Sequence, residues 1–178
     1  VTVVMIDGTE GLTEQDKRIA GYAHEQGRGV ILAVNKWDLV PKETNTMRDF
    51  ERELKEQLLF LDYAPVVFIS AATGQRINQL LELCLTVNEA RNMRLSTGRV
   101  NEIIQDAVAM NQPPSDKGVP LKIYYGAQVQ VQPPVFILHV NRKDLLHFSY
   151  ARYLENRIRQ EYGFVGTPIM IVAKEREE

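Results

Sequence analysis

The sequence predicts an α/β unit built on a parallel sheet, followed by a small α+β domain. Up to residue 94, short apolar and β-branched runs alternate with amphipathic helical segments, as in parallel strands joined by crossover helices. Beyond residue 95, two strand-like runs follow each other without a helix between them, which indicates antiparallel pairing. A length of 178 residues fits one domain or two small ones, and we set the expected boundaries at 1–94 and 95–178.

The first strand is expected at residues 1–6. These residues are apolar or β-branched throughout, which is typical of a strand buried on both faces of a sheet. Thr13 and Asp16 then have the spacing of a capping box, with Asp in place of Glu or Gln, and predict the start of a helix. Gly27 stands where a glycine commonly ends such a helix.

The second and third strands are expected at residues 29–34 and 66–69. The helix after the second strand carries an apolar stripe at helical spacing, formed by Met47, Phe50, Leu54, Leu58 and Leu61. The helix after the third strand is striped by Ile77, Leu80, Leu81, Cys84 and Val87.

The second domain is expected to begin with a helix whose buried face holds Val100, Ile103, Ile104, Ala107 and Val108. A polar loop comes next, and strands are then expected at residues 121–132 and 135–140. A helix at 148–162 and a last strand at 169–173 complete the domain. The element order is therefore helix, strand, strand, helix, strand.

Composition and charge exclude several classes of protein. Apolar residues make up 44 % of the chain and charged residues 25 %, so a disordered chain is not expected. The formal charge of −2 argues against binding nucleic acid mainly by bulk electrostatics. The single cysteine, Cys84, cannot form an internal disulfide and fits a reducing cytoplasm. No apolar stretch approaches the ~20 residues that span a bilayer, so no membrane partner is expected.

The sharpest chemical signal is the run Asn35-Lys36-Trp37-Asp38 at the end of the second strand. Open α/β sheets bind ligands at the carboxyl ends of their strands. The Asp38 carboxylate can accept hydrogen bonds from N1–H and the exocyclic amine of guanine, and adenine offers neither donor in that arrangement. The Asn35 amide can serve N7 and the neighbouring loop, and the Lys36 stem can lie over the base. A polar turn after a strand is the alternative interpretation of these four residues.

A second signal, Ser70-Ala71-Ala72, ends the next strand. The backbone N–H of Ala71 is predicted to donate to guanine O6, and the small side chains let the base approach. Small residues end many strands, so this signal is weak by itself. Because neighbouring parallel strands end at the same edge of a sheet, the two motifs together predict a guanine site.

These residues resemble a GTPase of the translation-factor class. The similarity extends through residues 7–16, Asp-Gly-Thr-Glu-Gly-Leu-Thr-Glu-Gln-Asp, and through the second half at 121–125, 147–150 and 166–169. The whole chain is similar to the second G domain plus the KH-like domain of the Der (EngA) family. Those proteins are double-G-domain GTPases of bacterial ribosome assembly.

The resemblance implies the C-terminal half of a P-loop-type G domain followed by a KH-like domain. It implies base-specificity residues Asn35, Lys36 and Asp38, and a second base-contacting loop of Ser70, Ala71 and Ala72. GTP or GDP is the implied ligand, with Mg²⁺ in the intact parent. The implied partners are large-subunit rRNA and the first G domain of the parent chain. The leading interpretation is therefore a fragment of a GTP-hydrolysing ribosome biogenesis factor acting on the large subunit.

The phosphate-binding half of a G domain is not found in these residues. No Gly-x-x-x-x-Gly-Lys-Ser/Thr loop occurs, and Asp7 to Gly11 has the wrong spacing for the Asp-x-x-Gly turn that senses the γ-phosphate. Phosphoryl transfer depends on those parts. We therefore expect this chain alone to hydrolyse no GTP, to bind it weakly, and to hold no catalytic residue and no metal ligand. The chain also begins on a strand without Met, so we expect a truncated sequence whose residues 1–6 form an unpaired apolar edge.

The alternative interpretation is a non-enzymatic module that docks RNA or protein, built on a remnant G domain. From residue 95 on, ten Lys and Arg stand against nine Asp and Glu, which is no basic footprint. The Gly-x-x-Gly match at 163–166 holds two bulky apolar residues, so a helix cap and turn is favoured over an RNA clamp. Tyr124 and Tyr125 are expected to be packing residues rather than base-stacking platforms.

Overall fold

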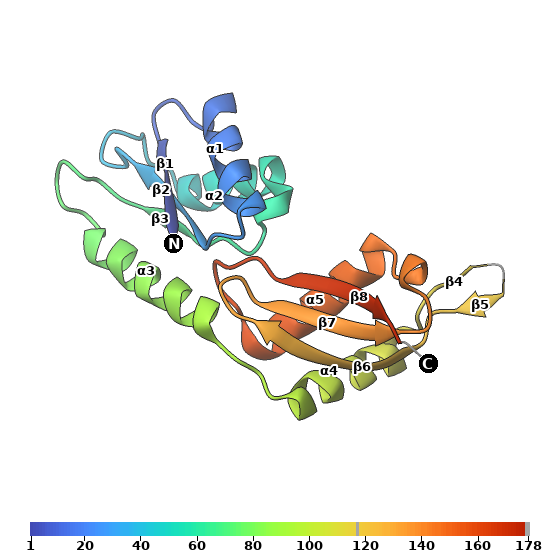
Figure 1. Cartoon of the computed structure of the whole chain (residues 1–178). Coiled ribbons are helices and arrows are strands. Elements are labelled where there is room, and N and C mark those ends of the chain that lie inside the picture. Colours follow the sequence, from blue (N-terminus) through green and yellow to red (C-terminus); the bar gives the residue numbers. More distant parts are fainter. Residues whose placement is uncertain (117, 177–178) are drawn as a thin grey trace. The chain divides into compact units, whose positions relative to one another are not determined.

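The structure is a computed structural model, and it describes residues 1–116 and 118–176. The chain divides into two compact units (Figure 1). Unit 1 comprises residues 1–91 together with 165–168, and unit 2 comprises the other described residues. An α/β unit is thus followed by a small α+β unit, which confirms the predicted fold class.

Unit 1 is built on a three-stranded parallel sheet in the order β1–β2–β3. The strands are β1 (Thr2–Asp7), β2 (Val30–Asn35) and β3 (Val66–Phe68), and the helices are α1 (Glu14–Glu25), α2 (Thr46–Gln57) and α3 (Ile77–Asn92). The central strand β2 is buried almost throughout, as its apolar sequence predicts. β1 lies at one edge of the sheet, so the expectation of an edge strand is confirmed.

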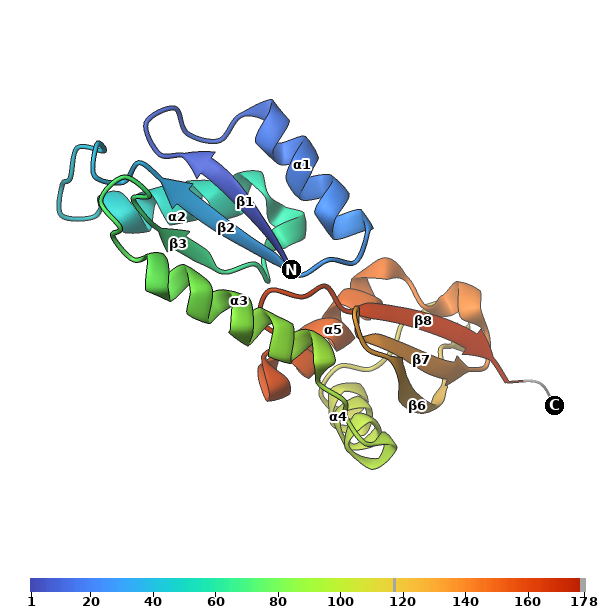
Figure 2. The ribbon, with the colours of Figure 1, turned by 60° about the vertical axis from the view of Figure 1, so that its left-hand side comes forward.

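Helices cover both faces of the sheet in unit 1 (Figure 2). Alternate residues of β2 point to opposite faces, because side chains alternate along a strand. Leu32 and Val34 pack in one cluster with residues of α1 and α2. Ile31 and Ala33 pack in another cluster with Val87 of α3. The sheet is therefore the middle layer of three.

The predicted capping box opens α1. Thr13 Oγ1 accepts from the Asp16 N–H, and the Thr13 N–H donates to Asp16 Oδ2 at 3.0 Å. Gly27 follows the end of the helix at φ 62°, in the left-handed conformation that glycine adopts without strain. The two ends of α1 therefore follow from local side-chain chemistry.

The second helix ends earlier than its apolar stripe predicts. α2 stops at Gln57, and a short 3₁₀ turn, η1 (Leu59–Leu61), follows it. The Lys55 ammonium donates to carbonyls in the segment after the helix, those of Leu61, Asp62 and Ala64. These donations satisfy carbonyls that have left the helix and have no helical N–H partner. Leu58 and Leu61 are fully buried and Met47 is exposed. The apolar stripe therefore predicted the burial of its last residues but placed the end of the helix too late.

Unit 2 places two helices on one face of a three-stranded sheet in the order β6–β7–β8. Its main elements are α4 (Thr97–Met110), β6 (Ile123–Gln130), β7 (Val135–Val140), a 3₁₀ turn η2 (Lys143–Leu145), α5 (Phe148–Tyr162) and β8 (Met170–Glu175). The predicted antiparallel pairing of β6 with β7 is confirmed, and β8 adds in parallel to β7. Two short strands, β4 (Ser115–Asp116) and β5 (Val119–Pro120), pair where only a loop was predicted.

The other face of the unit 2 sheet is exposed. Tyr124 and Tyr125 are 49 % and 43 % exposed, so the expectation that they are packing residues is wrong. A register shift between Ile123 and Tyr125 adds one residue to β6 at this point. Such a bulge re-aims side chains, which sequence alternation does not reveal.

A short segment from beyond α5 belongs to unit 1. The Val30 N–H donates to the Gly166 carbonyl at 2.7 Å, and the Gly166 N–H donates to the Tyr63 carbonyl at 3.0 Å. These backbone bonds extend the hydrogen bonding at the start of β2. Residues 165–168 are therefore structural parts of unit 1 although they follow α5 in sequence.

The helices that the structure describes include none that is both long enough and apolar enough to cross a bilayer.

Candidate functional site

The two predicted loops meet at one edge of the unit 1 sheet. Asn35 is the last residue of β2, and its side-chain Oδ1 accepts the Ala71 N–H from the loop after β3 at 2.9 Å. The sequence reasoning expected the Asn35 amide to serve the neighbouring loop, and this bond does so. The structure thus brings Asn35 and Ala71 together directly.

Backbone bonds and a buried indole fix the loop after β2. The Ile69 N–H donates to the Val34 carbonyl at 2.8 Å, and the Trp37 N–H donates to the Ile69 carbonyl at 3.0 Å. The Trp37 ring is buried against Phe68 and Phe50, at centroid distances of 4.5 and 5.7 Å. The aromatic residue of the motif therefore anchors the loop, and its neighbours on both sides face solvent.

Lys36 and Asp38 are the exposed members of the motif. Lys36 has φ 58°, an uncommon left-handed conformation for a residue with a side chain. Its carbonyl accepts the Leu39 N–H at 3.0 Å, which closes the turn. The Asp38 carboxylate makes no hydrogen bond or ion pair within residues 1–116 and 118–176. Its acceptor oxygens are therefore available to a ligand.

The loop after β3 presents small side chains to solvent. Ser70 is fully buried, and its Oγ accepts the Thr73 N–H at 3.2 Å. Ala71 and Ala72 are exposed. The Ala71 N–H, predicted to donate to a guanine O6, donates here to Asn35. The next amide, that of Ala72, has no partner in the described part of the chain.

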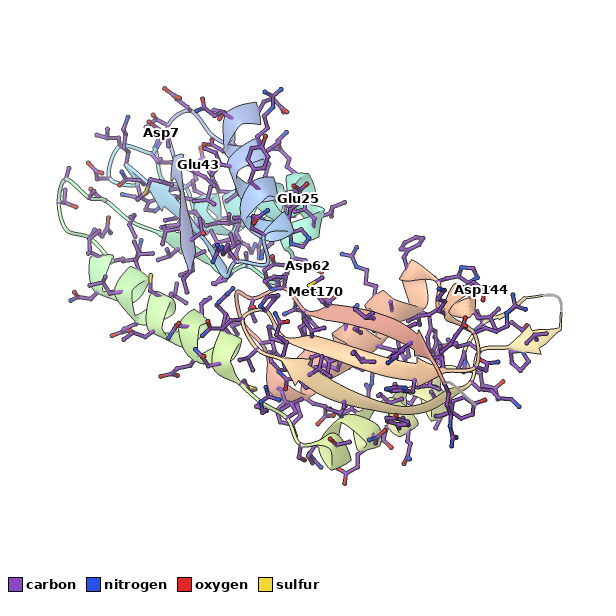
Figure 3. The ribbon with its side chains drawn as sticks, in the orientation of Figure 1. Asp7, Glu25, Glu43, Asp62, Asp144 and Met170 are labelled. Atoms are coloured by element: carbon purple, nitrogen blue, oxygen red, sulfur yellow. The ribbon has the colours of Figure 1, made fainter. Side chains whose placement is uncertain are left out.

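Asp7 belongs to the same edge and was missed as a site residue by sequence reasoning. It is the last residue of β1, at the end of that strand (Figure 3). In the sheet register it lies beside Asn35. Its carboxylate pairs with the Lys36 ammonium, with Oδ2 and Nζ 2.5 Å apart, and its Oδ1 accepts from the Thr9 N–H at 2.8 Å. Its place at a strand end was a signal, because parallel strands end at one edge.

The ion pair changes the pKa of both partners. The hydrogen bond from Lys36, helped by those from Thr9, holds the pKa of Asp7 well below its usual range. The same hydrogen bond raises the pKa of Lys36. Both groups are therefore ionised at neutral pH, and this edge of the sheet carries a fixed pair of opposite charges beside the free Asp38 carboxylate.

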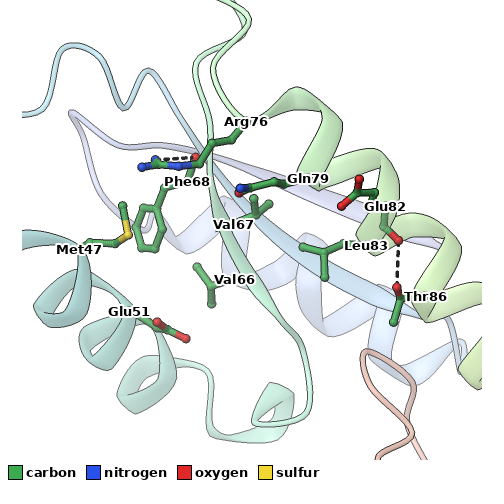
Figure 4. Close-up of a pocket in the computed structure, with 10 residues that line it drawn as sticks. All are labelled: Met47, Glu51, Val66, Val67, Phe68, Arg76, Gln79, Glu82, Leu83 and Thr86. Carbon is green, nitrogen blue, oxygen red and sulfur yellow. Dashed lines mark hydrogen bonds between the residues drawn. The ribbon is translucent and has the colours of Figure 1, made fainter.

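A groove lies along β3, between α2 and α3 (Figure 4). Its volume is about 440 Å³, and its lining includes Val66, Phe68 and Leu83 with the charged Glu51 and Glu82. The Arg76 guanidinium crosses one end and donates to the Phe68 carbonyl at 3.2 Å. None of the six predicted base-site residues lines this groove. It is therefore separate from the loops that Asn35 joins to Ala71.

The Gly-x-x-Gly match at 163–166 is a helix cap and turn, as predicted. Gly163 ends α5 at φ 76°, and its N–H donates to the Arg159 carbonyl at 2.7 Å. Phe164 is buried. Arg159 also pairs with Glu155 on the same helix at 2.8 Å. These groups are engaged within the protein, so this turn offers no free clamp for a phosphate.

No group of three or more His, Cys, Asp or Glu side chains in the described ranges is arranged to hold a metal ion. The groups at the carboxyl edge of the unit 1 sheet are the carboxylates of Asp7 and Asp38, the Asn35 side-chain amide, backbone amides and the Lys36 ammonium. That set suits the hydrogen-bonding edge and the flat face of a base.

Two families of known proteins match the chain. Residues 1–90 match the family described as Elongation factor Tu GTP binding domain. Residues 94–174 match the family described as KH-domain-like of EngA bacterial GTPase enzymes, C-terminal. The two matches meet near the point where unit 1 gives way to unit 2.

Curated relatives match over the whole chain. The GTPase Der of Enterococcus faecalis is 52 % identical over 177 residues, which are 99 % of this chain and 41 % of that protein. The GTPase Der of Agathobacter rectalis is 54 % identical over 178 residues, which are 100 % of this chain and 40 % of that protein. The chain therefore spans about two fifths of the length of the curated relatives it matches.

A solved structure of Era from Aquifex aeolicus, bound to GDP and AlF4⁻, aligns with 97 % of this chain and 64 % of its own. The identity is 18 % and the TM-score is 0.42.

Proposed function

Because the chain belongs to the family of the elongation factor Tu GTP-binding domain and is related along its whole length to the Der (EngA) GTPases, we propose that residues 1–94 recognise guanine. The observation that carries the proposal is the joining of the two loops by the Asn35–Ala71 hydrogen bond, with Asp38 free beside it. Asn35, Lys36, Asp38, Ser70, Ala71 and Ala72 are the proposed base-site residues.

The proposed selectivity for guanine follows from hydrogen bonding at the edge of the base. Asp38 accepts from N1–H and from the exocyclic amine, while O6 faces the amide of Ala72, which is unpartnered within the described residues, because the Ala71 amide already donates to Asn35. Adenine supplies no donors to Asp38, and a charged acceptor left unpaired costs about 1–3 kcal/mol or more. This is a discrimination of about tenfold or greater. The exposed stem of Lys36 covers the flat face of the base.

The proposed activity of the whole protein is GTP hydrolysis. The 178 residues contain no Gly-x-x-x-x-Gly-Lys-Ser/Thr loop, so the phosphates and their Mg²⁺ are assigned to the rest of a longer protein. The residues of this chain bind and select the base, and they move no proton and transfer no phosphoryl group. We expect guanine-specific but weak binding and no hydrolysis by the chain alone.

An Asp38→Asn variant tests the base assignment. Asn replaces one acceptor oxygen by a donor, which suits the additional carbonyl of xanthine in place of the amine of guanine. The ratio of XMP to GMP affinity, measured by titrating each nucleotide into the chain, should rise by about tenfold or more. Glu43→Gln, which removes an exposed carboxylate with the same charge change, should leave the ratio unchanged. An unchanged ratio in the Asp38 variant would contradict the proposal.

For residues 95–178 we propose a KH-like docking role in the assembly of the large ribosomal subunit, in the cytoplasm and next to a first G domain. The exposed face of the unit 2 sheet supports an RNA partner. Tyr125 stacks on His139 at a centroid distance of 4.2 Å, and Arg176 lies 5.6 Å from the Tyr124 ring centre. The single carboxylate in the three strands, Glu175, accepts the Lys143 N–H at 3.0 Å. Exposed aromatic rings with nearby cations suit unpaired bases.

Co-sedimentation with isolated large ribosomal subunits tests the docking role. Losing a stacked base contact costs about 1–3 kcal/mol, so Tyr125→Ala should weaken the association by about tenfold. Phe148→Ala, which removes another exposed ring in the same unit, is the control and should have little effect. Equal effects of the two variants, or no association of the native chain, would count against the role.

A further inference from the structure

We propose that Asp7 is a positioning residue of the base site, because it holds the Lys36 side chain ready to cover the base. The inference rests on the proposed recognition of guanine and adds a residue on a third strand end to it.

The two oxygens of the Asp7 carboxylate have different partners. Oδ1 accepts from the Thr9 N–H at 2.8 Å and from the Thr9 hydroxyl at 2.7 Å, which anchors the carboxylate to its own loop. Oδ2 faces the Lys36 ammonium at 2.5 Å. One side of the group is therefore fixed by local bonds, and the other is directed at the lysine.

The backbones that carry the pair are also fixed relative to each other. Asp7 and Asn35 are neighbours in the parallel register of β1 and β2. The Gly8 N–H donates to the Asn35 carbonyl at 2.8 Å, and a Cβ at Gly8 would lie 2.9 Å from that oxygen. Close approach of the two loops therefore requires glycine at this position. The Asp7 and Lys36 side chains begin from rigid, adjacent supports.

Among the residues of this site, Lys36 loses the most side-chain entropy when a ligand binds, so it benefits most from being held in place beforehand. Its four-carbon stem has many rotamers, and a free lysine loses that freedom when it settles on a ligand. Lys36 is 52 % exposed in its side chain, so its stem remains open to a ring while Asp7 holds its far end. Ordering a contact group before the ligand arrives raises affinity without any new contact.

Asp7 and Asp38 should affect the binding of different sets of bases. Lys36 contacts the flat face of a purine, which guanine and xanthine share. Asp38 contacts the edge, where the two bases differ. Loss of Asp7 should therefore weaken GMP and XMP binding alike and leave their ratio unchanged.

A double-mutant cycle on the full chain tests the inference, with GMP and XMP as the probes. Asp7→Asn keeps an acceptor for Thr9 and removes the charge that faces Lys36. It should weaken GMP binding by about three- to tenfold. In a Lys36→Met background, which retains an apolar stem, the same change should have no further effect. Glu10→Gln removes a nearby charge from the same loop and should change affinity less than about twofold.

Two results would overturn the inference while the proposed function stands. One is native GMP affinity in Asp7→Asn, and the other is an equal loss with and without Lys36. Asp7→Glu, which restores the charge on a longer stem, should recover part of the affinity, and thermal unfolding shows whether each variant is folded. If the native chain binds GMP no better than AMP, the proposed function itself fails.

Discussion

Trp37 shows how a single residue serves both the core and the site of this protein. Its side chain is 2 % exposed and packs on Phe50 and Phe68, while Lys36 and Asp38 on either side face solvent. The left-handed backbone of Lys36 makes this arrangement possible, because it turns the chain sharply at the strand end. An apolar anchor thus presents two polar groups in a fixed geometry.

Gly166 is the residue whose backbone requirements give the sharpest stability prediction. It has φ +70°, and a Cβ there would lie 2.3 Å from Val87 Cγ2 on α3. Gly166→Ala should cost about 1–2 kcal/mol for the left-handed backbone and about 1–3 kcal/mol more for overpacking. Denaturant unfolding followed by the fluorescence of Trp37, the single tryptophan and a residue of unit 1, measures the loss.

Two other glycines separate the backbone cost of the Gly166→Ala substitution from its packing cost. Gly74 has φ +78° with no atom within 4 Å of its Cβ position, so Gly74→Ala should show the backbone cost alone. Gly21 lies in the open on α1, and Gly21→Ala should stabilise the chain by about 0.5–1 kcal/mol. If Gly166→Ala proved as mild as Gly74→Ala, the close packing of residues 165–168 against α3 would be wrong.

Among the elements, local signals predicted both ends of α1 and of α5 but missed the end of α2. The capping box fixed the start of α1, and the predicted range of 148–162 matches α5. The apolar spacing of Leu58 and Leu61 correctly predicted that both are buried. Burial alone, however, does not distinguish an α-helix from a 3₁₀ turn. The turn depends on the Lys55 ammonium reaching three carbonyls, a contact that periodicity cannot show.

The candidate site was predicted as far as its motifs are local in sequence. Asn35, Lys36 and Asp38 stand together, and a strand end marks Ser70 to Ala72. Periodicity and motifs could not show which groups pair when they lie far apart in the sequence. The Ala71 amide bonds to Asn35, and Lys36 bonds to Asp7, because three parallel strands end at one edge. The exposure of Tyr125 was missed for a similar reason, since it depends on a bulge in β6.

At the scale of the whole molecule, unit 1 is formed by two segments that are far apart in the sequence. Unit 1 recruits residues 165–168 from beyond α5, and their backbone bonds reach Val30 and Tyr63. A cut near residue 92 would therefore remove part of unit 1 along with unit 2. The intact chain is the appropriate object for every comparison of variants.

A map of backbone amide NMR shifts, recorded as GMP is titrated into the intact chain, tests whether the two loops form one guanine site. The amides of 35–38 and 70–72 should shift together at the same GMP concentration, and AMP should leave them in place. Shifts confined to one loop, shifts at the β3 groove instead, or an equal response to AMP would contradict a single guanine site.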